Sequence, residues 1–222
     1  MIYLPVSLLL FLVFLLLLPF IWVVVALDVV EVAVVKLGFS PNVAFLLFAT
    51  VLIGSTINIP LYRVESVIPI VPDFRDMWLH QFWGIPLQKT KRRIIVALNV
   101  GGGLIPAILA IYELTRSDPL SIILVTVIVT IISYFSAQIV PGIGIQMNAL
   151  IAPLTAAISA ILIAEPIAPS VAFAGGILGT LIGADLLHLK EIERMSAGVL
   201  SIGGAGVFDG IAMCGLFTLL LT

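Results

Sequence analysis

The chain has 222 residues, of which 62% are hydrophobic and only 10% are charged, and its mean hydropathy is +1.30. A soluble domain carries about 25% charged residues, so this composition excludes an ordinary soluble protein and predicts a polytopic membrane protein. The net charge of −2 offers no attraction to nucleic acid, and we expect no nucleic-acid partner. The single cysteine, Cys214, excludes an intrachain disulfide.

Seven apolar stretches approach the length of about 20 residues that a membrane-spanning helix needs. We expect them at Tyr3–Leu27, Asn42–Ile57, Gly102–Leu114, Leu120–Gln138, Ala149–Ala164, Ser170–Leu189 and Ala197–Leu221. The first is interpreted as a retained helix because it has no basic start and no small-residue cleavage site. Asp28–Leu37 is expected to be a short interfacial helix that ends at Gly38. The predicted fold is an all-α bundle of about seven transmembrane helices, in a single integral membrane domain over residues 1–222.

A polar loop, residues 58–93, separates the second and third spans. It holds most of the basic residues of the chain, namely Arg63, Arg75, Lys89, Lys91, Arg92 and Arg93. The positive-inside rule therefore places this loop and the N-terminus in the cytoplasm and the C-terminus outside the cell membrane. The basic side chains are expected to bind anionic headgroups of membrane lipids. Ile59–Val67 and Arg93–Val100 are rich in β-forming residues, and we expect them to pair as a small hairpin-like sheet at the cytoplasmic surface.

Two carboxylates lie inside consecutive predicted spans, Asp185 in the sixth and Asp209 in the seventh. An ionisable residue at membrane depth costs about 2.5–3.5 kcal/mol on insertion scales, so each is interpreted first as functional. Small residues repeat along one face of the sixth span, at Gly175, Gly179 and Gly183, and allow a neighbouring helix to approach closely. We therefore expect residues 170–222 to form a diaspartate helix pair in which two carboxyls share one proton.

The dyad depends on where the seventh helix begins. A start near Gly203 would bring the two carboxyls to a similar depth. A regular helix from Ala197 would instead put Asp209 about 18 Å into the membrane, at about 1.5 Å per residue. That second arrangement favours a proton or cation relay.

Short motifs around these aspartates resemble those of a known enzyme group. Gly183-Ala184-Asp185 resembles a shortened GxGD signature of intramembrane aspartyl proteases, the presenilin, signal-peptide-peptidase and prepilin-peptidase group. Val207-Phe208-Asp209 resembles the aromatic-Asp motif of the presenilin branch, and Pro106-Ala107-Ile108-Leu109 loosely resembles its Pro-Ala-Leu element. The order of the motifs differs, because the aromatic-Asp motif follows the GxD motif and the proline element precedes both.

The resemblance implies that Asp185 and Asp209 are catalytic and that no cofactor is needed. Gly183, His188, Gly206 and Phe208 would then surround the pair. The whole chain, including Ile57-Asn58-Ile59-Pro60-Leu61-Tyr62-Arg63, also resembles an uncharacterised archaeal and bacterial multi-pass membrane family, known as a domain of unknown function. That second resemblance implies no activity.

His188 follows Asp185 by one helical turn and shares its face. The two side chains could supply two metal ligands. However, the chain has only one other histidine, His80, and a catalytic zinc site takes three protein ligands. No metal site is expected, and His188 is interpreted as an interfacial histidine.

Three asparagines, Asn58, Asn99 and Asn148, neighbour breaks rich in glycine and proline. Their amides could bind a substrate backbone, as in the broken helices of transporters, or satisfy backbone groups left by the interrupted helices. Both alternatives remain open. Irregular backbone is tolerated at membrane depth where it lines a cavity or is buried in protein, so a substrate-positioning backbone is expected at Gly101, Gly102, Gly103 and Pro106.

The function predicted from these observations is an intramembrane aspartyl-protease-like hydrolase that cleaves a transmembrane peptide with Asp185 and Asp209. One alternative is a proton- or cation-coupled transporter or channel that uses the same carboxylates. Another is a structural or assembly subunit, and a homo-oligomer could form through the glycine-rich helix faces. Glu113 and Glu165 fall at the external ends of spans, and we expect both to be solvated.

Overall fold

The structure is a computed structural model that describes residues 35–69, 89–140, 144–191 and 198–204. It also describes shorter pieces nearer the ends of the chain, at residues 11, 13–19, 24, 28, 31–32, 211, 213–215, 218–219 and 221–222. The pieces that fall within the predicted first span and interfacial helix are helical, and the rest of both predictions lies outside the described residues. Gly38 ends the interfacial segment with φ +79°, as its glycine predicted.

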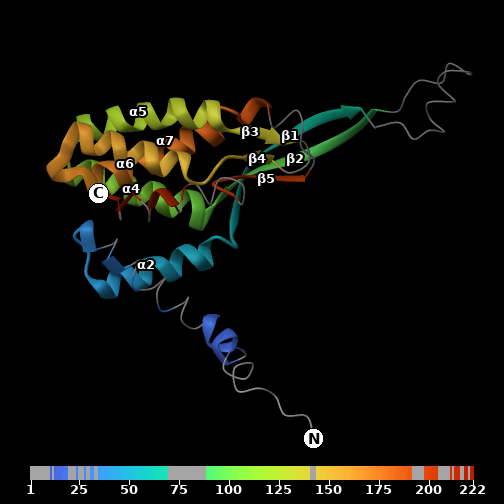
Figure 1. Ribbon diagram of the computed structural model, residues 1–222. Helices are drawn as coiled ribbons and strands as arrows, with labels where there is room; N and C mark the ends of the chain where they lie inside the picture. Colours follow the sequence, from blue (N-terminus) through green and yellow to red (C-terminus); the bar gives the residue numbers. More distant parts are fainter. Residues whose placement is uncertain are drawn as a thin grey trace, which may run out of the picture.

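A bundle of four helices forms the body of the protein (Figure 1). Its members are α4 (Ile105–Arg116), α5 (Pro119–Ser136), α6 (Ile151–Ala164) and α7 (Ala168–Thr180). Helix α7 contacts the other three, and nearly all of its residues are buried. Helix α2 (Pro41–Gly54) runs beneath the bundle in this view, and most of its side chains are partly or fully exposed. These bounds agree closely with the predicted second to sixth spans.

Two of the helices are extended by wide π-helical turns. The segment η1 (Val100–Leu104) precedes α4, and η3 (Leu181–Leu186) follows α7. The third predicted span, expected to be short or broken, is instead a continuous helical segment that changes from π to α geometry after its glycines. A short 3-10 segment, η2 (Glu165–Ile167), joins α6 to α7 and reverses the chain, so that Gly176 lies against Ala156.

A three-stranded sheet, in the order β1-β2-β5, lies at one end of the bundle (Figure 1). Strands β1 (Asn58–Pro69) and β2 (Lys89–Asn99) are antiparallel and pair Asn58 with Asn99. The predicted hairpin pairing is confirmed. Strand β5 (Gly198–Ile202) joins β2 in parallel. A smaller antiparallel pair, β3 (Gln138–Val140) and β4 (Gly144–Gln146), lies near the same end of the bundle and was not predicted.

Of the two predicted starts of the seventh helix, the one at Ala197 is wrong, because Gly198–Ile202 is a strand. A short apolar run cannot be assigned to a helix or a strand from its periodicity alone, and here pairing with β2 decides for the strand. Farther along the chain, the described residues from Ile211 onward are mostly helical. The fold is therefore predominantly helical with a small sheet, rather than all-α.

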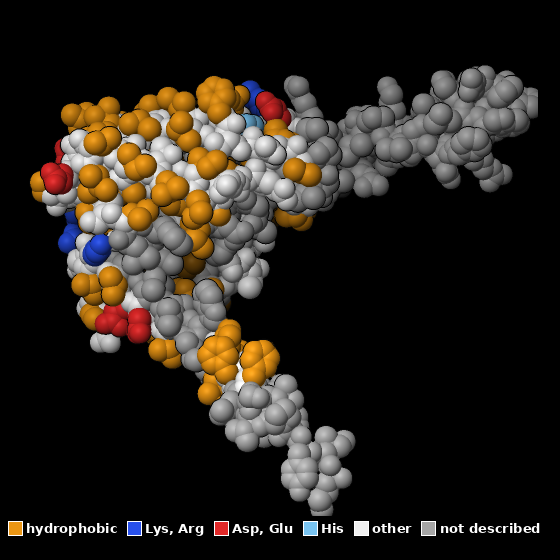
Figure 2. Space-filling model, viewed as in Figure 1, with side chains coloured by type: hydrophobic (Ala, Val, Ile, Leu, Met, Phe, Trp, Pro, Cys, Tyr) orange, Lys and Arg blue, Asp and Glu red, His pale blue; other side chains and the backbone are white. Residues whose placement is uncertain are grey.

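Two helical stretches, Pro119–Ser136 and Ile151–Glu191, are long and apolar enough to cross a membrane by length and composition. The second contains the reversal between α6 and α7. Exposed apolar side chains cover the visible face of the bundle between charged groups near its two ends (Figure 2). On α5 they are Leu120, Ile123, Leu124, Val127, Ile128, Ile131, Ile132 and Phe135. Such a surface is typical of a protein with a lipid-facing belt.

The predicted glycine face of α7 packs inside the same chain. Added Cβ atoms at Gly175 and Gly179 would meet Val125 and Val129 of α5 at 2.6 Å. A Cβ at Gly183 would overlap the carbonyl oxygen of Thr130. The glycines thus let α5 and α7 approach backbone to side chain. The glycine face of α7 therefore has a partner within the same chain, namely α5. Oligomerisation through glycine-rich helix faces stays a prediction.

Candidate functional site

Asp185 is buried within η3, with 4% of its surface exposed. Its Oδ2 accepts a hydrogen bond from the backbone N–H of Gly203 at 2.6 Å. Hydrogen bonds among the described residues leave the other oxygen, Oδ1, without a partner. Gly203 directly follows β5 and has φ +67°, a conformation that favours glycine. The sheet therefore presents one backbone amide to the buried carboxyl.

The glycine turn η1 also packs against Gly203. Gly101, Gly102 and Gly103 are all buried, and a Cβ at Gly203 would come within 2.7 Å of the Cα of Gly103. Asp185 and the predicted substrate-positioning backbone therefore meet at Gly203. A Cβ at Gly101 would overlap Val51 O, so the end of α2 also packs directly on η1.

Asn99 holds this turn in place. Its Oδ1 accepts the N–H of Gly102 at 2.7 Å, and its Nδ2 donates to the carbonyl of Ser55 at 2.8 Å. The same Nδ2 donates to Asn58 Oδ1 at 3.2 Å, and Ser201 Oγ donates to that oxygen at 2.5 Å. The three strands are thus joined by a polar node of Asn58, Asn99 and Ser201. The amide of Asn99 satisfies interrupted backbone, which was one of its two predicted roles.

Pro106 is buried in the first turn of α4, where a proline costs no backbone hydrogen bond. Because Pro106 closely follows η1 in the sequence, its fixed backbone angle sets the direction in which α4 leaves the turn. Asn148, in contrast, is exposed and only caps its own segment, with Oδ1 accepting Leu150 N at 3.0 Å. No hydrogen bond between described residues connects Asn148 to Asp185 or to the polar node.

His188 lies behind Asp185 and is 6% exposed. Its Nδ1 is 3.1 Å from both Gly183 O and Ala184 O, and its ring stacks on Tyr134 with centroids 4.5 Å apart. Both neighbours of Nδ1 are acceptors, so this nitrogen carries the hydrogen. Its role is to bind the backbone just before Asp185.

Asp209, Gly206 and Phe208 lie outside the described residues. The chain on either side of them is placed: Gly203 bonds to Asp185, and Cys214 Sγ lies 3.6 Å from Thr180 Oγ1 of α7. The stretch that contains Asp209 is therefore anchored at both ends to the α7–η3 helix. Over the parts of the chain that are described, no three His, Cys, Asp or Glu residues lie together as a metal site would need.

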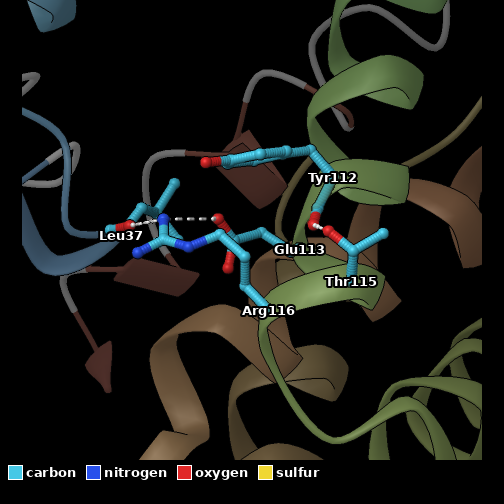
Figure 3. Close-up of polar contacts among 5 residues, drawn as sticks. All are labelled: Leu37, Tyr112, Glu113, Thr115 and Arg116. Atoms are coloured by element: carbon cyan, nitrogen blue, oxygen red, sulfur yellow. Dashed lines mark hydrogen bonds and ion pairs between the residues drawn. The ribbon is translucent and has the colours of Figure 1, made fainter.

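A second polar cluster lies at the other end of α4 (Figure 3). Arg116 donates to Leu37 O at 3.1 Å and lies over the rings of Phe39 and Tyr112, at 5.9 Å and 5.4 Å. Its Nη1 is 3.8 Å from Oε1 of Glu113. Glu113 is only 2% exposed and this oxygen has no hydrogen bond, so the prediction that it is solvated is wrong. Its partner Arg116 binds the turn before α2, a contact that no local pattern indicates.

The sequence pointed to Asp185, Asn99, Asn58 and the glycine turn, and the structure joins them through Gly203. The sequence did not point to Ser201 or Tyr134. Ser201 would have been found only by recognising β5 as a strand, since pairing with β2 brings Ser201 beside Ala97. Beside the polar node, Asp185 and Gly203 add one buried carboxyl and the backbone amide that is bonded to it.

No curated protein and no solved structure matches the chain. Residues 52–221 match the model of a family that is described as a protein of unknown function (DUF1614). This range contains the sheet, the four-helix bundle and every residue of the polar node. The chain belongs to the DUF1614 family.

Proposed function

We propose that this chain is a multi-pass membrane protein of about seven spans that hydrolyses peptide bonds in membrane-embedded segments, with Asp185 and Asp209 as its catalytic pair. The sheet end would face the cytoplasm, with the N-terminus cytoplasmic and the C-terminus external, because six of the ten basic residues lie within residues 58–93, which comprise β1, β2 and the segment between them. The bound substrate would be a transmembrane peptide that is locally unwound. The weak, reordered likeness to GxGD-type proteases agrees with this chemistry.

One observation carries the proposal. Asp185 bonds to Gly203, and Cys214 contacts Thr180, so the chain bearing Asp209 leaves and rejoins the same helix. The absence of a helix at Gly198–Ile202 also removes the arrangement that would have carried Asp209 deep into the membrane.

The chemistry needs only water and two carboxyl groups. One ionised carboxylate takes a proton from water, whose oxygen attacks the peptide carbonyl carbon. The other, protonated carboxyl gives its proton to the carbonyl oxygen, and a tetrahedral diol forms. Collapse of the diol breaks the C–N bond as the amine takes a proton from the dyad. Oδ1 of Asp185, which no described residue bonds, would take part in this exchange, while Gly203 holds Oδ2.

Cleavage of a reporter with a labelled transmembrane helix tests the proposal in proteoliposomes. Asp185→Asn and Asp209→Asn should each abolish cleavage, whereas Asp118→Asn should not, because Asp118 is an exposed helix cap at the opposite end of the bundle. Activity that survives either of the first two changes would refute the catalytic pair. A cysteine pair at positions 185 and 209, in a Cys214→Ala background, should form a disulfide, which requires Cα atoms within about 7 Å.

A second candidate function, proton or cation coupling, is favoured by the buried Glu113. The bundle then holds a buried carboxyl toward each end, Asp185 near the sheet and Glu113 near Arg116. A relay would predict that Glu113→Gln abolishes proton flux across proteoliposomes and that Asp185→Asn does so as well. The hydrolase predicts instead that Glu113→Gln leaves reporter cleavage within about twofold of the wild-type rate, because a buried glutamine keeps the shape of the side chain.

A further inference from the structure

We propose that His188 is the positioning residue for Asp185, because it holds open the wide turn from which the carboxyl projects. In η3 the backbone bonds skip one residue more than in an α-helix, as in the bond from Leu187 N to Ile182 O at 3.0 Å. His188 Nδ1–H lies within 3.1 Å of both Gly183 O and Ala184 O. One side chain thus bonds the two carbonyls that immediately precede Asp185.

The imidazole can do this only if its ring plane is fixed. Tyr134 of α5 stacks on it with an interplanar angle of 22°. Gly183 packs on the same helix, where a Cβ would come within 2.9 Å of Ser133 Cβ. Gly183 and the ring of His188 therefore both pack against α5, which fixes the wide turn and the imidazole together.

The consequence for Asp185 is geometric. Relaxing a π-turn to an α-turn moves the following residues by about one position, which is a rotation of about 100° and a shift of about 1.5 Å. Asp185 and Gly203 N are only 2.6 Å apart, so a movement of that size would break their bond. His188 therefore acts through Asp185 and does not itself contact the reacting groups. This step rests on the proposed function only in calling Asp185 catalytic.

Metal binding by His188 is the main rival explanation. It would need Nδ1 or Nε2 to join at least two more ligands, and no group of three metal-ligating side chains occurs in the described parts of the chain. Nδ1 is already bonded to two carbonyl groups. The positioning role uses Nδ1, which the structure shows hydrogen-bonded to these two carbonyl groups.

The test is hydrogen exchange at the Gly203 amide, measured by ¹⁵N NMR on the full-length protein in micelles. His188→Phe keeps the stacked ring but removes the donor. It should speed exchange at Gly203 by about tenfold, as should Asp185→Ala, since each removes the bond that protects this amide. His188→Asn places an amide N–H where Nδ1 was and should restore a rate within about threefold of wild type. Tyr134→Phe keeps the ring stack and should behave like wild type.

The amide of Ala160, fully buried in α6, is the internal reference. Unchanged exchange at Gly203 in His188→Phe would overturn the positioning role, and so would an equal rise at Gly203 and Ala160, which would mean general destabilisation. If His188→Phe does not fold, Tyr134→Leu frees the imidazole without altering it and is judged by the same two amides. Loss of reporter cleavage plays no part in this readout, so the positioning role and the proposed hydrolysis can fail separately.

Discussion

Replacing Asn99 with alanine tests whether the polar node stabilises the fold, with no need to measure activity. The side chain is 4% exposed and makes three hydrogen bonds, to Gly102 N, Ser55 O and Asn58 Oδ1. Alanine would leave the buried Gly102 N–H and the carbonyl of Ser55 without these partners. The turn η1 would also lose the side chain that caps its start.

The expected loss of stability follows from those groups. A buried polar group left unsatisfied costs about 1–3 kcal/mol, and a lost cap costs about 1 kcal/mol, although the two overlap at Gly102. We therefore expect Asn99→Ala to lower the free energy of unfolding by about 3 kcal/mol. Asn148→Ala is the matched control, because Asn148 is exposed and makes one local bond to Leu150 N. Its replacement should cost less than about 1 kcal/mol.

Reversible unfolding in mixed micelles with an increasing fraction of denaturing detergent measures both values. The difference between the two variants is the informative quantity, since changes in the micelle affect both alike. Equal losses for Asn99→Ala and Asn148→Ala would refute the reasoning that the buried bonds of Asn99 hold the turn. A large loss for Asn99→Ala would also mean that any activity lost with it must be corrected for folding before a substrate role is assigned.

Three further predictions concern the helices. Gly183→Ala should destabilise the fold by about 1–3 kcal/mol through overlap with α5, whereas Gly215→Ala, whose Cβ would meet its nearest atom at 3.6 Å, should change stability by less than about 0.5 kcal/mol in the same unfolding assay. Side-chain and backbone hydrogen bonds from Ser121 lower the pKa of Asp118 below its ordinary 3.8, so its cap should stabilise α5 above that pH and lose effect as the pH falls through the lowered pKa. Circular dichroism between pH 5 and 2 should show that Asp118→Asn abolishes this part of the acid sensitivity. Arg116→Met should cost about 1 kcal/mol, and less when Glu113→Gln is also present; a loss that is the same in both backgrounds would show that the two side chains are not coupled.

Much of the helical layout could be predicted because its signals are local. Asp118-Pro119 begins α5 as a cap followed by proline, and Glu165-Pro166 marks the reversal between α6 and α7. The pairing of β1 with β2 could also be predicted, since both runs are β-rich and flank one loop. Strand β5 could not, because its partner in β2 is about a hundred residues away and a five-residue apolar run carries no period of its own.

The candidate site shows the same division between local and distant signals. A carboxylate in an apolar run singled out Asp185, and glycines beside a proline singled out η1. What joins them is the backbone of Gly203, and a backbone amide has no signature in the sequence. The burial of Glu113 was missed for a related reason. Its position near a helix end suggests exposure, but its partner Arg116 packs on Leu37 and Phe39, which come from a segment far away in the chain.

A proton or cation relay would need a polar path between the two ends of the bundle. From η1 to Glu113, α4 covers about 14 Å at about 1.5 Å per residue. The residues buried along that length include Ala110, Val125, Val129 and Ile177, all with 1% exposure or less. A chain of waters needs two to four polar partners at each site, and these side chains supply none, while the buried polar groups of the four bundle helices, apart from Glu113, are the hydroxyls of Ser121, Ser133, Ser159 and Thr180. Asp185 instead lies beside the sheet, where it bonds to Gly203 directly after β5. Water reaching it from that end would not have to cross this apolar core, and an unwound segment could approach at the same level.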